Sequence, residues 1–487
     1  MKYSLLYKTP DPREISDVAY DLSVDRAVRA VIPDARRADN MLTVLMKPLV
    51  LRENIVYRQN ILKDFLALPQ LYDDLKVIFN RYDKVKSDWR EMRGGAYPSG
   101  GASNSRALVD YTFASLKVTA MFPKTIISFF RSISDTLSKY EIKSDGLCEI
   151  KRYCGEILGN DSLSELERTA ALFAYKTPES FEFSVAAGLD ETFRLASCGL
   201  CAITDISGER EDNMFAKLFR RKKSDGSVEI EDDEATNDAV LGIVNEALHR
   251  VDSALSQVTD GVYEVFYGLS GEMQFYDAAI SYTGYMQDAG APIVFPTVLE
   301  KEADSFSARG LCDPVLITDG IAAAEIVRNP IDIGGEMDGM LIRGSNKTGK
   351  TSYLRAVGAA QLFMQSGLPV CADSAEISIR SAIYTHFSSA EEEFRAGDTA
   401  GRFEGEVQLV DKIIRGAQSR PYSLILMNET FQTTSYSEGA DGMHDILSAL
   451  PKIKAKYIFV SRLAKLFELA DKQRVKLVTM TDGFTAE

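Results

Sequence analysis

The chain has 487 residues, of which 45% are hydrophobic and 26% charged, and its formal net charge is −15. Such a composition is typical of a globular protein with two to four domains of about 100–200 residues each. There is no apolar stretch of about 18 residues and no apolar segment after the first lysine, so neither a membrane span nor a secretory signal is expected and a cytoplasmic protein is predicted.

The first part of the chain is predicted to be helical. Apolar residues recur at spacings of three and four through residues 14–85, 106–200 and 239–290, which indicates helices with one buried face. Residues 93–105 are rich in Gly, Ser and Pro and show no periodicity, so they are expected to form an exposed loop.

A charged segment at residues 207–237 interrupts this helical pattern. Its basic run consists of Arg220, Arg221, Lys222 and Lys223. A Ser-Asp-Gly turn and the acidic residues 229–234 follow. Two interpretations stay open: a solvated loop that neutralises its own charge, or a basic patch that contacts the backbone of DNA. The acidic net charge gives no general attraction to polyanions, so DNA binding would depend on such a local patch.

From residue 291 the chain is predicted to change to an α/β fold. Short apolar runs bounded by Gly, Pro and Asp alternate with helical segments, which favours a buried, largely parallel sheet. The predicted strands lie at 315–317, 340–342, 424–427, 457–460 and 475–480. We therefore predict a helical region over 1–300 followed by an α/β domain over 301–487.

A phosphate-binding loop is the strongest motif. The sequence Gly344-Ser-Asn-Lys-Thr-Gly349-Lys350-Thr351 follows a predicted strand and begins a predicted helix, which is the context that a P-loop requires. Backbone N–H groups and the helix N-terminus would hold the phosphates of ATP, Lys350 would reach the β- and γ-phosphates, and the Thr351 hydroxyl would ligate Mg²⁺. The predicted nucleotide-binding residues here are Gly344, Ser345, Asn346, Lys347, Thr348, Gly349, Lys350, Thr351 and Ser352.

A second strand ends in polar residues that fit the same chemistry. The apolar run 424–427 is followed by Asn428 and Glu429. In P-loop ATPases the first of these positions is normally an Asp in the Mg²⁺ shell, and the second is a Glu that orients or activates water. We predict Glu429 and Lys350 as catalytic residues and Asn428, with Thr351, as metal ligands.

These motifs together resemble the ATPase domain of the MutS family of DNA mismatch-repair proteins. The likeness includes the run from Gly344 through Tyr353 and Arg355, the Asn428-Glu429 pair, and the segments 403–406 and 433–439. The segment Ile326-Val-Arg-Asn-Pro330 resembles the family's adenine-contacting stretch. A looser likeness extends over 15–310, where Pro48-Leu49 resembles the start of the helical core.

The resemblance implies a helical core and lever region, an ABC-type P-loop ATPase domain, ATP and Mg²⁺ as cofactors, DNA as a partner and a homodimer formed through the ATPase domain. It also implies that Ile326 and Val327 pack on adenine. No mismatch-reading domain is expected, because the core-like pattern begins near residue 20.

Three departures from the family pattern predict weakened hydrolysis. Asn428 replaces the metal-binding Asp, Gly401-Arg402 replaces a signature Ser-Thr, and Ser461-Arg462 replaces a Thr-His pair. The leading hypothesis is a DNA-binding ATPase of repair or recombination. The alternative is a nucleotide-dependent conformational switch that acts on a protein partner. A small-molecule kinase is a weaker third hypothesis, because the long helical region does not fit it.

Overall fold

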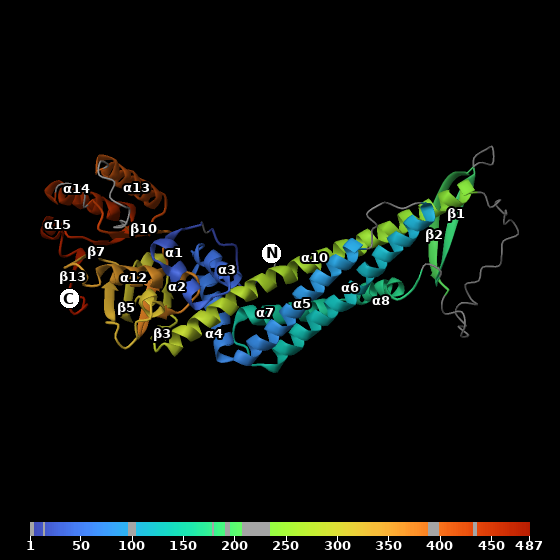
Figure 1. Ribbon diagram of the computed structural model, residues 1–487, viewed down its shortest axis with the longest axis horizontal. Helices are drawn as coiled ribbons and strands as arrows, with labels where there is room; N and C mark the ends of the chain where they lie inside the picture. The colour runs from blue at the N-terminus through green and yellow to red at the C-terminus, as the bar shows by residue number, and fades with distance from the viewer. Residues whose placement is uncertain are drawn as a thin grey trace. The chain divides into compact units, whose positions relative to one another are not determined.

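The computed structural model describes eight stretches of the chain (Figure 1). They are residues 4–12, 15–95, 104–177, 180–189, 195–206, 234–387, 399–431 and 436–487. These residues form two compact units: one contains the described residues of 70–141 and 149–270, and the other contains those up to Pro69 together with 142–148 and 271–487. No helix in the described stretches is both long enough and apolar enough to cross a bilayer. The domain boundary near residue 300 stays a prediction.

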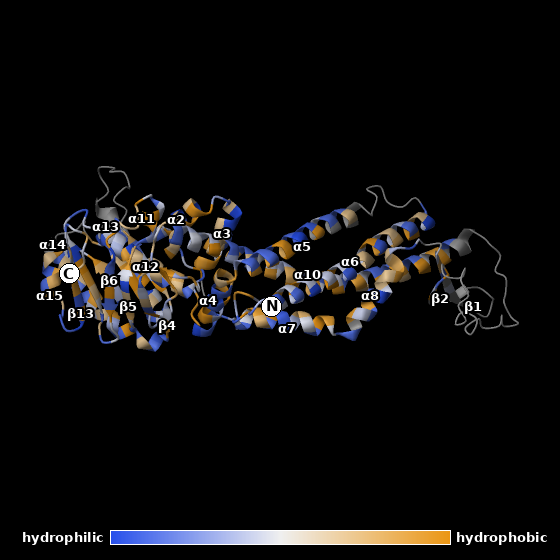
Figure 2. Cartoon of the chain, turned by 90° about the horizontal axis from the view of Figure 1, so that it is seen from below, coloured by the Kyte–Doolittle hydropathy of each residue, from blue (hydrophilic) through white to orange (hydrophobic). Residues whose placement is uncertain are grey.

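Long helices build the first unit. They are α5 (Pro69–Gly95), α6 (Ser105–Lys139), α8 (Asp161–Ala174) and α10 (Glu234–Asp288), with α7 (Asp145–Leu158) and α10 each contributing residues to both units. Apolar and polar residues alternate along α5, α6 and α10 in Figure 2, as expected for helices with one buried face. An aromatic cluster joins these three helices, because the ring of Phe266 lies 4.8 Å from the centroids of both Tyr82 and Phe130.

A β-hairpin in the first unit contradicts the helix predicted over 106–200. Strands β1 (Phe181–Leu189) and β2 (Leu195–Asp205) pair antiparallel, with Phe181 opposite Asp205. The alternation Phe-Glu-Phe-Ser-Val at the start of β1 has a period of two, which the helical reading overlooked. The predictions for 207–233, including the basic run Arg220–Lys223, lie outside the described residues. Most of the loop predicted at 93–105 also lies outside them, and its first residues, 93–95, belong to α5.

The second unit brings the start of the chain together with its C-terminal part. Helices α1 (Val18–Asp21), α2 (Val24–Val31), α3 (Ala35–Leu45) and α4 (Arg52–Ala67) belong to it. Helix α12 (Lys350–Gln365) is held to this segment by paired hydrogen bonds: the Leu49 N–H donates to the Gln365 carbonyl at 2.8 Å, and Gln365 Nε2 donates to the Leu49 carbonyl at 2.7 Å. The predicted helices of residues 14–85 are therefore confirmed, and the segment at Leu49 is bonded to the C-terminal end of α12.

A five-stranded parallel sheet is the centre of the second unit. Its strand order is β10-β11-β12-β7-β13, and every neighbouring pair is parallel. The strands are β7 (Gly339–Gly344), β10 (Ile383–Phe387), β11 (Leu424–Asn428), β12 (Lys456–Val460) and β13 (Val475–Met480). The predicted parallel sheet is confirmed, as are its strands near 340, 424, 457 and 475. Because parallel strands end on the same side, the predicted site residues after β7 and β11 share one edge.

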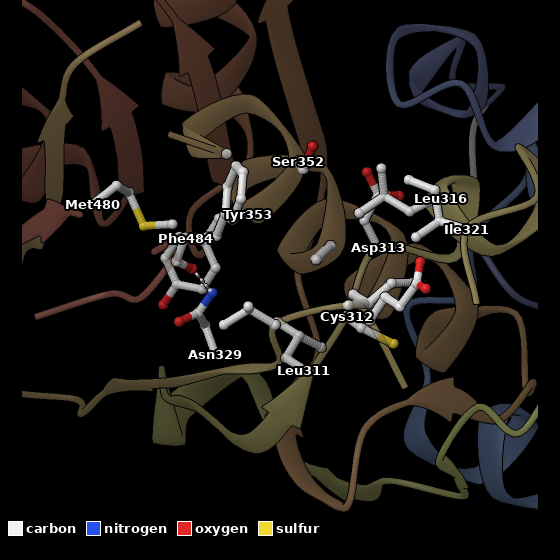
Figure 3. Close-up of a pocket in the computed structure, with 15 residues that line it drawn as sticks. Leu311, Cys312, Asp313, Leu316, Ile321, Asn329, Ser352, Tyr353, Met480 and Phe484 are labelled. Carbon is white, nitrogen blue, oxygen red and sulfur yellow. Dashed lines mark hydrogen bonds between the residues drawn. The ribbon is translucent and has the colours of Figure 1, made fainter. Parts of the chain in front are cut away.

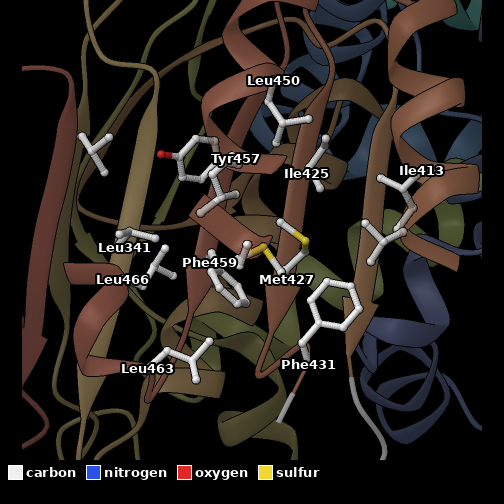
Figure 4. Close-up of a cluster of buried hydrophobic side chains, with 14 of the residues drawn as sticks. Leu341, Ile413, Ile425, Met427, Phe431, Leu450, Tyr457, Phe459, Leu463 and Leu466 are labelled. Atoms are coloured by element: carbon white, nitrogen blue, oxygen red, sulfur yellow. The ribbon is translucent and has the colours of Figure 1, made fainter. Parts of the chain in front are cut away.

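Helices cover both faces of this sheet. On one face α13 (Thr399–Ser419), α14 (Tyr436–Ala449) and α15 (Ala464–Leu469) pack in an apolar cluster that includes Ile413, Ile425 and Phe459 (Figure 4). Helix α12 packs against β7, β11 and β12. A Cβ at Gly358 of α12 would lie 2.7 Å from Leu426 Cδ1, so Leu426 faces α12 while its neighbour Ile425 faces the cluster. Burial on both faces explains the continuous apolar runs of these strands.

A smaller sheet adjoins the start of α12. Its strand order is β4-β9-β5-β6, and a separate pair joins β3 and β8. The strands are β3 (Ile293–Val294), β4 (Thr297–Leu299), β5 (Phe306–Leu311), β6 (Asn329–Ile333), β8 (Val370–Cys371) and β9 (Ser374–Ser378). The strand predicted at 315–317 is wrong, because α11 (Pro314–Thr318) occupies these residues. Pro314 suits the first helical position and Asp313 Oδ1 caps the helix by accepting from the Val315 N–H at 3.0 Å.

Candidate nucleotide-binding site

The loop between β7 and α12 has the backbone geometry of an anion cradle. Lys347 and Gly349 adopt positive φ angles of 65° and 82°, which turns the chain sharply before α12 begins at Lys350. A Cβ at Gly344 would lie 2.6 Å from the Met480 carbonyl oxygen, so only glycine fits there. Among the described residues, the N–H groups of Asn346, Lys347 and Gly349 donate to no backbone carbonyl. These donors and the N-terminus of a 16-residue helix suit a bound anion.

Lys350 places a buried positive charge inside this loop. Its side chain is 5% exposed, and Nζ donates to the carbonyl oxygens of Gly344 and Ser345 at 2.9 and 2.5 Å. Among the described residues no carboxylate lies within 4 Å of Nζ. Burial lowers the pKa of Lys350, and the more distant Glu429 opposes that shift. An incoming anion would supply the negatively charged partner that the lysine lacks.

The polar ends of α12 and β11 lie side by side. Thr351 Oγ1 is 3.5 Å from Asn428 Oδ1, so the two predicted metal ligands present neutral oxygens to the same space. The described residues contain no cluster of three or more His, Cys, Asp or Glu side chains that could hold a metal. Mg²⁺ often takes few protein ligands and completes its shell with water and phosphate oxygens. This pair of oxygens fits such a shared site.

Glu429 stands at the same edge but its carboxylate is already bound. Arg462 Nε donates to Glu429 Oε1 at 2.8 Å and Arg462 Nη2 donates to Oε2 at 3.0 Å. The backbone of Glu429 has φ 57°, and its N–H donates to the Val460 carbonyl at 2.8 Å. Sequence reasoning singled out Arg462 only as a departure, and the pairing depends on the adjacent ends of β11 and β12.

A mostly apolar cavity of about 320 Å³ opens beside the loop (Figure 3). It is lined by Leu311, Cys312, Asp313, Leu316, Ile321, Glu325, Ile326, Val327, Asn329, Gly349, Ser352, Tyr353, Ala356, Met480 and Phe484. The predicted adenine contacts, Ile326 and Val327, therefore share one cavity with Gly349 and Ser352 of the loop and the following helix. The volume lies within the range of ligand pockets.

Two cavity residues carried no signal in the sequence. Phe484 follows the last strand, and its carbonyl accepts from Asn329 Nδ2 at 2.9 Å, while the Ala486 N–H donates to Asn329 Oδ1 at 2.8 Å. These bonds turn the segment after β13 back, which places Phe484 at the cavity, while the pairing of Met480 with Gly344 in the sheet places Met480 there. Their role depends on contacts between distant segments, so no local pattern could have indicated it.

Some predicted positions cannot be placed. The basic run Arg220–Lys223 lies outside the described residues, as do residues 433–435 after β11. Gly401 and Arg402 belong to α13, but the positions of their side chains are not described. The site described here therefore consists of the β7–α12 loop, the ends of β11 and β12, and the cavity.

Two family models match the chain. The MutS2 N-terminal domain matches residues 51–289, and MutS domain V matches residues 340–483, which contain the loop, Asn428, Glu429 and Arg462. The two matches follow the helical-then-α/β order of the chain.

Curated relatives match about a third of the chain. A DNA mismatch repair protein MutS of Caldanaerobacter subterraneus subsp. tengcongensis is 33% identical over 159 residues, which is 32% of this chain and 18% of the relative. The MutS of Finegoldia magna is 34% identical over 154 residues, 31% of this chain and 17% of the relative. DNA mismatch repair protein MSH3 of Chaetomium globosum is 33% identical over 132 residues, 27% and 11% of the two chains. The chain thus spans less than a fifth of the length of each of these relatives.

Proposed function

The chain belongs to the MutS family, and from this premise we propose that it is an ATP-binding protein of DNA repair or recombination whose contact with DNA depends on nucleotide. One observation carries the proposal: the apolar cavity opens at Gly349 and Ser352, beside a buried Lys350 that has no carboxylate within 4 Å among the described residues. A site with a mostly apolar compartment next to a cationic one suits a nucleotide, whose base has flat aromatic faces and whose phosphates are anionic.

Each part of the nucleotide has a proposed binding group. The N–H groups of residues 344–352 and the ammonium group of Lys350 would hold the phosphates, while Ile326 and Val327 would pack on the base. A magnesium ion, when bound, would supply positive charge to the phosphates, with Thr351 and Asn428 as its protein oxygens. Glu429 would accept the proton of the attacking water once its carboxylate is free.

DNA contact is proposed for the first unit and for the basic run Arg220–Lys223. The match of residues 51–289 to the MutS2 N-terminal domain supports a helical region of the family's kind. The names of the curated relatives, DNA mismatch repair proteins, support a repair-related role. We propose binding without a mismatch-reading wedge, and a homodimer that forms through the ATPase domain.

A second candidate function has specific support. Asn428 brings no negative charge to the metal position, and Glu429 is paired with Arg462 in a bidentate ion pair. Both features favour slow hydrolysis. A nucleotide-dependent switch that acts on a protein partner, with little or no turnover, is therefore the alternative.

The experiment is a comparison of ATP binding and ATPase rate, measured without DNA and with single-stranded, duplex and branched DNA at several salt concentrations. We expect DNA to raise the ATPase rate. We expect reversal of the charges of Arg220–Lys223 to weaken DNA binding and to reduce the slope of log affinity against log salt concentration by the equivalent of up to about four phosphate contacts. Reversal at Lys452 and Lys472, two exposed lysines away from the site, is the control. Nucleotide binding with no DNA effect would favour the switch, and no nucleotide binding would exclude both functions.

A further inference from the structure

The ion pair between Arg462 and Glu429 is built by two neighbouring strands. β11 and β12 are paired in register so that Asn428 lies opposite Val460. Glu429 follows the first of these residues, and its N–H donates to the carbonyl of the second at 2.8 Å. Arg462 is two residues beyond Val460, so the sheet brings the guanidinium to the carboxylate with hydrogen bonds of 2.8 and 3.0 Å.

This pair makes Glu429 a weaker base. Two N–H groups of one guanidinium donate to the two oxygens of Glu429 in a bidentate, charge-assisted pair. A general base must accept a proton from water through one of these same oxygens, and a cation bound to the carboxylate favours its unprotonated form. Arg462 therefore disfavours proton transfer from water to Glu429 as long as the pair is intact.

The charges around the pair favour an exchange of partners. Lys350 and Arg462 are two cations that act on the single carboxylate of Glu429, so this corner has one positive charge in excess. The Arg462 side chain is 43% exposed and that of Glu429 is 18% exposed. Because Arg462 is partly exposed, water lowers the cost of breaking the pair. A phosphate group that enters beside Lys350 offers oxygens that the planar fork of an arginine guanidinium can bind in pairs.

We propose that Arg462 senses the terminal phosphate: it pairs with Glu429 when no triphosphate is bound and moves to the γ-phosphate when one is. This inference rests on the proposed nucleotide binding at Lys350. With Arg462 on the phosphate, Glu429 is free. Water oxygen then bonds to the γ-phosphorus, its proton passes to Glu429, and the electron pair of the broken P–O bond leaves with ADP.

The test measures affinity, not turnover. Dissociation constants for fluorescent ADP and for a non-hydrolysable fluorescent ATP analogue give a ratio that reports how strongly the protein prefers the triphosphate. We expect Arg462→Ala to reduce this preference about tenfold, with ADP affinity unchanged, because one charge-assisted contact to the γ-phosphate is lost. Arg462→Lys should restore only part of it, since lysine cannot donate in the same fork.

A double-mutant cycle separates the exchange from a simple change in charge. Glu429→Gln should increase the triphosphate preference in the wild-type background by releasing Arg462, and should have little effect in the Arg462→Ala background. Equal effects of Glu429→Gln in both backgrounds would mean that the carboxylate only repels phosphate and that Arg462 does not change partners.

Arg474→Ala is a matched control. Arg474 also forms a bidentate pair, with Asp338, but before β7 and β13 rather than after β11 and β12. Its removal should leave the ratio unchanged. If Arg462→Ala leaves the ratio at the wild-type value while both nucleotides bind, the sensor is excluded and the proposed function stands. If wild-type protein binds neither nucleotide, both are excluded.

Discussion

Two buried lysines stand at opposite ends of the parallel sheet. Lys350 follows the carboxyl end of β7 and is 5% exposed, whereas Lys456 begins β12 at the amino end and is 2% exposed. Each ammonium group donates to two backbone carbonyls: Lys350 to Gly344 and Ser345, and Lys456 to Asp304 and Gly334 at 2.5 and 2.9 Å. Burial lowers the pKa of both, that of Lys456 to about 8.

The two lysines differ in how their charge is compensated. Lys456 lies 3.5 Å from Asp304 Oδ2, and the same carboxylate pairs with the fully buried Arg380. Lys350 has no such partner among the described residues. A buried charge with a permanent partner serves the fold, whereas an uncompensated one is available for an external anion. The comparison agrees with the general rule that ligands bind at the carboxyl ends of parallel strands.

The largest effect should come from Lys350→Ala. We expect nucleotide affinity to fall about a hundredfold or more, because the variant loses the only ammonium group proposed to reach the terminal phosphates. The free energy of unfolding without nucleotide should change by less than about 1 kcal/mol, since an uncompensated buried charge is also removed. Equilibrium binding of labelled ATP and urea denaturation test the two parts. Unchanged ATP affinity would contradict the proposal that the buried charge of Lys350 binds an external anion.

Lys456→Met should have the opposite profile. It leaves the carbonyls of Asp304 and Gly334 without their donor, so we expect a loss of about 2–4 kcal/mol in the free energy of unfolding. Nucleotide affinity should not change, because the substitution lies at the other end of the sheet. A variant with normal stability and weakened ATP binding would show that the two ends are not independent.

The pH dependence of the free energy of unfolding gives a second test of Lys456→Met. The folded-state pKa of Lys456 is about 8, below its ordinary value of 10.5, so between these values the unfolded chain binds the proton that the folded chain has released. Wild-type stability relative to Lys456→Met should therefore rise from pH 8 to 10.5, by up to about 1.4 kcal/mol per pH unit, and stay level below pH 8. Urea midpoints of both proteins at several pH values measure it. A difference that does not grow with pH would mean that Lys456 stays charged.

Local patterns were enough to predict the strands and the loop at the carboxyl end of the sheet, but not the contacts at its amino end. The strand β7, the loop proposed to bind phosphate and the start of α12 follow one another in the sequence, so their order could be predicted from local spacing. The partners of Lys456 come from Asp304 and Gly334, which are 152 and 122 residues away. Such contacts depend on the tertiary fold, as do the pairing of Glu429 with Arg462 and the position of Phe484.

Two errors in the predicted fold have local causes. The run 315–317 is apolar enough for a strand, but the preceding Asp-Pro supplies a helix cap and a first helical residue. The hairpin β1–β2 was hidden within a long apolar region, where short alternating stretches are difficult to distinguish from one helix face. The helices up to Pro69 were predicted correctly, but no pattern in them indicated that they would pack against α12.

Asn428→Asp would give the functional end a carboxylate like the one that Asp304 provides at the structural end. Without Mg²⁺ the new charge should weaken ATP binding by a few-fold, because it repels the phosphates. With Mg²⁺ it should strengthen binding and raise turnover by up to about tenfold, because a carboxylate is a better ligand than an amide beside Thr351 Oγ1. The measurement is ATP affinity and ATPase rate across a Mg²⁺ titration, with Asn428→Leu as a neutral control that lacks the oxygen.

If the Asp variant and wild type respond identically to Mg²⁺, position 428 does not approach the metal. If affinity rises without turnover, the bound carboxylate of Glu429 limits hydrolysis, and adding Arg462→Ala should then increase the rate.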